Sequence, residues 1–97
     1  MNTPVSLEIE KLLIEKDIDM PVSPTIAEVV MWLYEKHELW IEVSCHTILD
    51  EKDDDVDVFY FIVRELKPVN VLYSGDFVNS PTEAYLEAIE YTLKNLI

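Results

Sequence analysis

Residues 39–48, "LWIEVSCHTI", and residues 56–64, "VDVFYFIVR", decide the fold of this chain of 97 residues. The first segment alternates apolar with polar side chains, the pattern of a strand with one buried face. The second is apolar at almost every position, which favours a middle strand. A third β-rich segment, "VNVLYS" at 69–74, follows after a short turn. The three segments predict a three-stranded antiparallel meander.

Segments with apolar residues at helical spacing lie on both sides of these strands, at about 3–17, 23–38 and 80–97. Each opens with a hydroxyl residue and a proline, which suit an N-cap and the first helical position: Thr3-Pro4, Ser23-Pro24 and Ser80-Pro81. In the third, Glu83 completes a capping box with Ser80. The predicted fold is α+β, in the order α-α-β-β-β-α, with the helices packed on one face of the sheet. We expect one domain over 1–97, with an N-terminal helix and linker over 1–21 and an αβββα core over 22–97.

The composition limits the classes of partner. Twenty acids against seven bases give a formal net charge of −13, which repels phosphate backbones and argues against nucleic-acid binding. No apolar run is long enough to span a bilayer and the start of the chain does not resemble a signal peptide, so no membrane partner is expected. Cys45 is the only cysteine and cannot form an intramolecular disulfide, which fits a reducing cytoplasm.

The stretch "DEKDDDVD", residues 50–57, carries six acids and one lysine. A calcium-binding EF-hand loop needs glycine at its sixth position and glutamate at its twelfth. Counted from Asp53, these positions hold Val58 and Arg64, so the motif fails. The stretch favours a solvated hairpin turn. Repulsion among its charges would keep the flanking strands from pairing with strands of other molecules. Weak divalent binding and recognition of a basic partner remain as alternatives.

Catalytic motifs are lacking. Cys45 and His46 are neighbours on a strand, so they point to opposite faces and cannot form a nucleophile–base pair. Cys45 is expected to be buried on the core face. Glu42 and His46 share a face, but four strand steps separate them by about 13 Å. We therefore expect no enzyme, no cofactor and no metal; an enzyme using Glu42 and His46 is the least favoured class.

The sheet face turned away from the helices is a candidate interaction surface. Trp40, Glu42 and His46 are expected to point out from the first strand. The middle strand adds either Phe59 and Phe61 or the row that contains Tyr60. An exposed apolar patch of this kind suits a protein partner or a homodimer through the sheet face. The alternative is that the first helix or its linker folds across this face and covers it.

The segment "SPTIAEVVMWLYEKHELWIEV" and the closing "FVNSPTEAYLEAIEYTLKNLI" resemble a group of small uncharacterised proteins. These proteins occur in gut anaerobic bacteria and in their phages and mobile elements. The resemblance covers about residues 22–97, and its most specific part is the Ser-Pro-Thr-Glu-Ala-Tyr start of the last helix. It implies a cytoplasmic protein of phage or accessory origin, and it implies no activity or functional residue.

The sequence thus predicts a non-enzymatic, acidic protein that acts by binding another protein. The acidic turn would bind a basic partner, and the candidate contact residues are Asp53, Asp54 and Asp55. The alternative is an inhibitor that mimics nucleic acid, with carboxylates in place of phosphates. That alternative requires acids spread over a continuous surface.

Overall fold

The two segments that decide the fold form one long antiparallel hairpin. The computed structural model describes residues 3–97. In it, β1 (Leu39–Leu49) and β2 (Asp55–Leu66) pair along their whole length. A short third strand, β3 (Val69–Ser74), pairs only with the C-terminal part of β2 and gives the sheet order β1-β2-β3. The predicted meander is confirmed.

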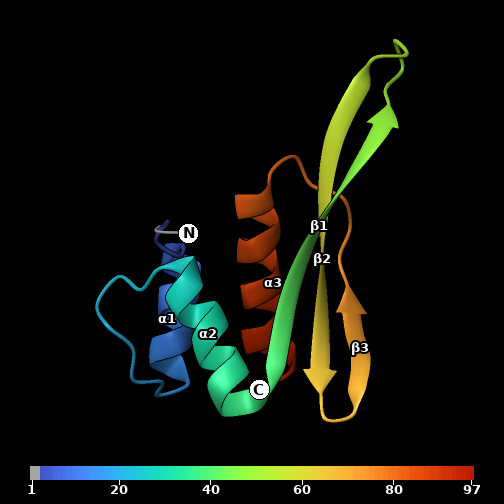
Figure 1. Ribbon diagram of the computed structural model, residues 1–97. Helices are drawn as coiled ribbons and strands as arrows, with labels where there is room; N and C mark the ends of the chain where they lie inside the picture. The colour runs from blue at the N-terminus through green and yellow to red at the C-terminus, as the bar shows by residue number, and fades with distance from the viewer. Residues whose placement is uncertain (1–2) are drawn as a thin grey trace.

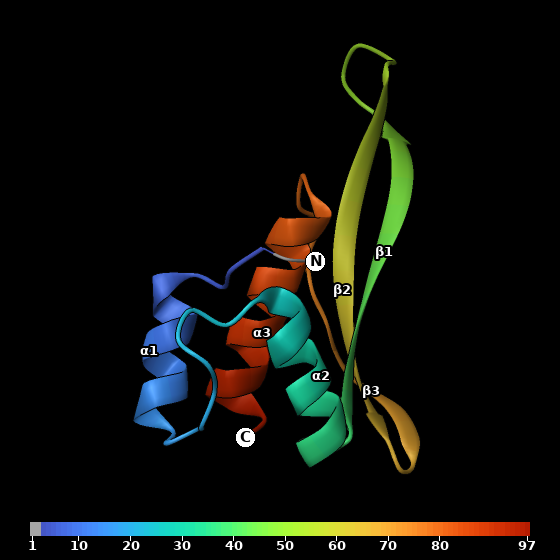
Figure 2. The same cartoon turned by 60° about the vertical axis from the view of Figure 1, so that its left-hand side comes forward.

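Three helices lie on one face of this sheet: α1 (Leu7–Glu15), α2 (Ile26–His37) and α3 (Pro81–Asn95). α2 and α3 contact the strands, whereas α1 packs against α3 on the side away from the sheet (Figure 1, Figure 2). The predicted α+β fold and its element order are therefore correct. One core joins the layers, and its fully buried residues include Ile9, Val29, Leu33, Val63, Ala88, Ile89 and Leu93.

The start of α1 differs from the prediction. Ser6, not Thr3, caps the helix, and its side chain accepts a hydrogen bond from the backbone N–H of Ile9. Pro4 lies outside the helix because it forms an isolated antiparallel bridge with Thr25. The chain before α1 is thus held against the chain before α2.

The start of α2 is also displaced from the prediction. Thr25, not Ser23, is the N-cap, and it forms a reciprocal capping box with Glu28. At α3 the expected cap is confirmed, because Ser80 accepts from the backbone N–H of Glu83 and Pro81 begins the helix. The Glu83 carboxylate reaches the N–H of Asn79 instead of the expected N–H of Ser80.

The Thr25 cap supports a prediction. Thr25→Ala is expected to lower the free energy of unfolding by about 1 kcal/mol, because the backbone N–H of Glu28 loses the hydroxyl that accepts from it. The matched control is Ser23→Ala, which removes the hydroxyl that the sequence pattern favoured and should change little. Urea unfolding followed by circular dichroism measures both. A larger loss for the Ser23 variant would contradict the observed cap.

The upper half of the hairpin projects beyond the helices. We call residues 44–57 the arm; most of its residues are exposed, and it makes the molecule 48 Å long against 31 and 20 Å in the other directions (Figure 1). Cys45 lies in the arm and is exposed, so the expectation that it is buried is wrong. It does point to the side of the helices by alternation, but no helix reaches that height.

The open face of the sheet carries the Tyr60 row, the second of the two predicted alternatives. Phe61 is buried in the core with 3% of its surface exposed, and Phe59 packs against that core. Neither phenylalanine therefore belongs to an exposed sheet-face patch, contrary to their choice as interaction candidates. Within residues 3–97, α1 does not contact any strand, so it leaves the open face uncovered.

Candidate functional site

The three residues predicted to lie on the open face of the first strand, Trp40, Glu42 and His46, each contact a different set of residues. Trp40 is 38% exposed and packs edge-on against Tyr34 of α2, with ring centroids 5.7 Å apart. The Glu42 carboxylate accepts a hydrogen bond from Arg64 Nε at 2.9 Å. His46 lies higher on the arm, where it contacts other aromatic rings. The structure therefore does not assemble these three side chains into one site.

A segment that the sequence did not mark as a strand follows the edge of β2. The backbone N–H of Gly75 donates to the carbonyl of Phe61, and Phe59 exchanges two backbone hydrogen bonds with Val78. This segment places Phe77 on the open face, 5.9 Å from the rings of both His46 and Tyr60. Phe77 was missed because "GDFVN" lacks the length and alternation of a strand.

The acidic turn at the tip of the arm is organised by one of its own side chains. The Asp50 carboxylate accepts from the backbone N–H groups of Lys52 and Asp54, at 2.8 and 2.9 Å. The residues proposed as contacts, Asp53, Asp54 and Asp55, are exposed. In residues 3–97, no group of His, Cys, Asp or Glu side chains is arranged to hold a metal ion. The geometry agrees with a solvated hairpin turn.

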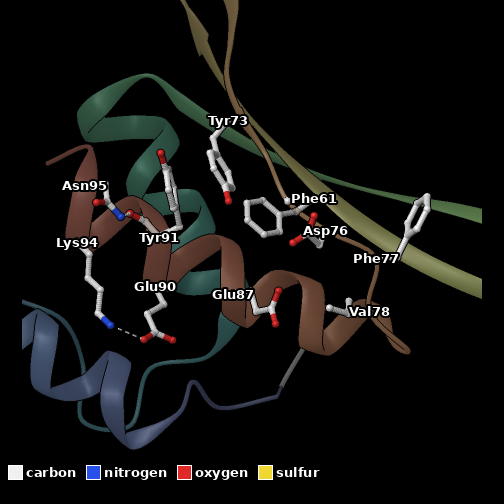
Figure 3. Close-up of a pocket in the computed structure, with 11 residues that line it drawn as sticks. Phe61, Tyr73, Asp76, Phe77, Val78, Glu87, Glu90, Tyr91, Lys94 and Asn95 are labelled. Carbon is white, nitrogen blue, oxygen red and sulfur yellow. Dashed lines mark hydrogen bonds and ion pairs between the residues drawn. The ribbon is translucent and has the colours of Figure 1, made fainter.

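An open groove lies between α3 and the end of β3. It has a volume of about 380 Å³ and lies on the helix side of the sheet (Figure 3). Tyr73 and Tyr91 form part of its wall, with rings stacked at a centroid distance of 3.8 Å and an angle of 19°. The ring of Phe61 continues this wall, 5.6 Å from Tyr73.

Carboxylates line the same groove. Asp76 approaches from the segment after β3, and Glu87 and Glu90 approach from α3 (Figure 3). Lys94 neutralises Glu90 through an ion pair of 2.7 Å. Among residues 3–97, Asp76 and Glu87 take part in no ion pair. The groove thus holds two carboxylates without a basic partner.

The environment of Glu87 reflects this surplus of negative charge. Its partial burial raises the pKa of the carboxyl above its usual value, and the nearby carboxylates of Glu83, Asp76 and Glu90 raise this pKa further. A cation placed in the groove would favour the ionised form and lower this pKa again. The arrangement therefore suits a positively charged ligand group.

The aromatic wall suits the same ligand. The apolar stem of an arginine or lysine side chain packs along aromatic surface while its charged group stays beside water or a carboxylate. The sequence contained part of the signal, because Glu87, Glu90, Tyr91 and Lys94 recur at helical spacing. Their meeting with Tyr73 and Asp76 depends on how α3 packs on the sheet, which no local pattern gives.

The comparisons with known proteins give no relative. No protein-family model matches the chain, and neither a curated protein nor a solved structure does. Within the part of the chain that the structure describes, no helix is long and apolar enough to cross a bilayer. The site must therefore be interpreted from its own chemistry.

Proposed function

We propose that this chain is a non-enzymatic protein-binding module that holds an arginine or lysine side chain of a basic partner in the groove between α3 and β3. The observation that carries the proposal is the pairing of the stacked Tyr73 and Tyr91 rings with the unpaired carboxylates of Asp76 and Glu87. The carboxylates neutralise the cation, and the aromatic wall packs along the apolar stem of its side chain.

Two further features of the chain support a basic partner. The net charge of −13 would draw such a partner in from a distance, and this attraction weakens as salt is added. The groove volume of about 380 Å³ lies in the range of small-ligand sites and accommodates one long side chain. A partner segment with arginine or lysine amid apolar residues fits both the charge and the rings.

The test uses two synthetic peptides with the same neutral backbone, one with arginine and lysine and one with glutamine at those positions. Binding to the full chain is measured by calorimetry and by NMR chemical shifts. The groove variant combines Asp76→Asn with Glu87→Gln, and the matched control combines Asp53→Asn with Asp54→Asn at the arm tip. Both variants lose two negative charges, so only their location differs.

We expect the basic peptide to bind and the glutamine peptide not to bind. The groove variant should weaken binding at least tenfold, and the arm variant by less than about twofold, because the charges at the arm tip are distant from the groove and salt screens them. Shifts should centre on Tyr73 and Tyr91. Equal losses in both variants would reduce the interaction to general charge attraction and contradict the groove. A larger loss in the arm variant would assign recognition to the acidic turn.

A further inference from the structure

A second hollow lies beside the groove, on the open face of the sheet. It has a volume of about 260 Å³, and its lining includes His46, Tyr60, Ser74 and Phe77. The rings of His46, Tyr60 and Phe77 contact one another, with centroids 5.1 to 5.9 Å apart. Phe77 is 56% exposed, so much of its ring is free to contact a further side chain. The hollow is therefore an aromatic site that is open to solvent.

The edge segment, residues 75–78, separates this hollow from the groove. Gly75, Asp76 and Phe77 line both cavities. The segment bonds to β2 through Gly75 and Val78, and it follows β3 along the same side of β2. Asp76 points to the groove on the helix side, whereas Phe77 points away from it to the rings of the open face (Figure 3). Consecutive side chains thus point to opposite faces of the sheet, as they do in a strand.

The outer side of the edge segment is open. The sheet has the order β1-β2-β3 in residues 3–97, so none of its strands lies beyond the segment. Asp76 and Phe77 are exposed, and their N–H groups take part in no backbone hydrogen bond within the same residues. An extended chain can therefore add to this edge through its own backbone N–H and C=O groups.

We propose that the basic partner binds as an added strand on the edge segment, with a cationic side chain in the groove and an aromatic side chain in the hollow. The inference rests on the proposed function, which supplies the cation. Neighbouring residues of an added strand alternate between the two faces of the sheet. An aromatic residue next to the cationic residue, or three positions from it, would therefore reach the hollow. One that is two positions away would stay on the groove side.

Charge and ring chemistry select this occupant. On the groove side, the carboxylates of Asp76 and Glu87 take part in no ion pair within residues 3–97, so a cation belongs there. On the hollow side, an added ring can pack offset or edge-on against His46, Tyr60 or Phe77, at about 4.5–7 Å between centroids. A second copy of this chain is a poorer occupant, because two chains that each carry a net charge of −13 repel one another.

The test uses four peptides that share one neutral backbone. Three contain one arginine and one tryptophan, at positions i and i+1, i and i+2, or i and i+3, and the fourth has alanine in place of tryptophan. The first three have the same composition, so they differ only in the face of an added strand that the tryptophan reaches. Calorimetry measures binding to the full chain, and NMR amide exchange reports on the N–H groups of Asp76 and Phe77.

We expect the tighter of the two odd-spaced peptides to bind about fivefold or more tightly than the i, i+2 peptide, as one added aromatic contact would give. In this complex, amide exchange should slow at Asp76 or Phe77. Phe77→Ala should abolish the advantage. The matched control is Trp40→Ala, which removes an exposed aromatic residue far from the hollow and should preserve it. Equal affinities for odd and even spacings would overturn the proposal, and so would an advantage that survives Phe77→Ala.

The outcomes also distinguish this inference from the proposed function. The alanine peptide tests the groove alone, and its binding should weaken when Asp76→Asn is combined with Glu87→Gln. If none of the four peptides binds, the proposed function fails. If the alanine peptide binds and tryptophan adds nothing at any spacing, the groove stands and the added strand fails.

Discussion

Ile9→Ala is expected to lower the free energy of unfolding by about 2–5 kcal/mol, the largest effect of any single change considered for this chain. Ile9 lies in α1 and is 0% exposed, within the core cluster that also contains residues of α2, α3 and the sheet. Truncating it removes apolar contacts and leaves a cavity in a helix interface that cannot fully close. The prediction treats α1 as part of the core, although it does not touch the sheet.

The matched control is Ile14→Ala on the same helix. Ile14 is 77% exposed, so its loss should change stability by no more than about 0.5 kcal/mol. Equilibrium unfolding in urea, with circular dichroism and tryptophan fluorescence as two probes, measures both variants. If the two variants are equally mild, α1 is an appendage and not a part of the folding unit. Transitions that no longer coincide for Ile9→Ala would show that α1 detaches separately.

The strand pattern predicted the sheet well because it rests on one local property. Alternation along 39–48 places Ile41 on the core side, and it is 2% exposed; its partner across the ladder, Val63, is fully buried. The apolar character of β2 on both faces also has a physical reason. Phe61 points to the helices, whereas Val58 is buried on the open face, opposite His46 in the ladder.

The alternation of apolar and polar residues along a strand cannot predict how far the helix layer extends along the sheet. It assigns Cys45 to the same face as Ile41, and that assignment holds, yet Cys45 is exposed because the helices end below it. The predicted helix caps at Thr3 and Ser23 are wrong for a similar reason. Thr3-Pro4 and Ser23-Pro24 match a local start signal, but their backbones pair with each other, with Val5 N–H bound to the carbonyl of Pro24. Tertiary pairing displaced both helix starts.

The groove could not be predicted from the sequence, because its walls come from three separate segments of the chain. Tyr73 lies near the end of β3, Asp76 lies in a segment without strand character, and Tyr91 and Glu87 lie on α3. Each has an ordinary local explanation as a strand, loop or helix residue. Only the packing of α3 against the sheet brings the two tyrosine rings to 3.8 Å and sets the carboxylates beside them.

Gly75→Ala is expected to lower the free energy of unfolding by about 1–3 kcal/mol, as overpacking of a close-packed site does. A Cβ atom at this position would lie 2.2 Å from the ring of Phe61, and that ring is held in the core with only 3% of its surface exposed. The backbone cannot easily retreat, because Gly75 N–H donates to the Phe61 carbonyl. The chain's only glycine is thus required by close approach to an aromatic ring.

The same substitution in a Phe61→Leu background tests this cause. If the clash with the ring is the source of the loss, the double variant should be more stable than the sum of the two single changes predicts, by about 0.5–3 kcal/mol. Urea unfolding of the unaltered chain, the two single variants and the double variant completes this double-mutant cycle. Binding of the basic peptide is the second measurement. Gly75 precedes Asp76, so displacement of the segment should also weaken peptide binding in Gly75→Ala. Additive losses would show that the alanine is tolerated beside Phe61 and that the glycine acts only through its backbone freedom.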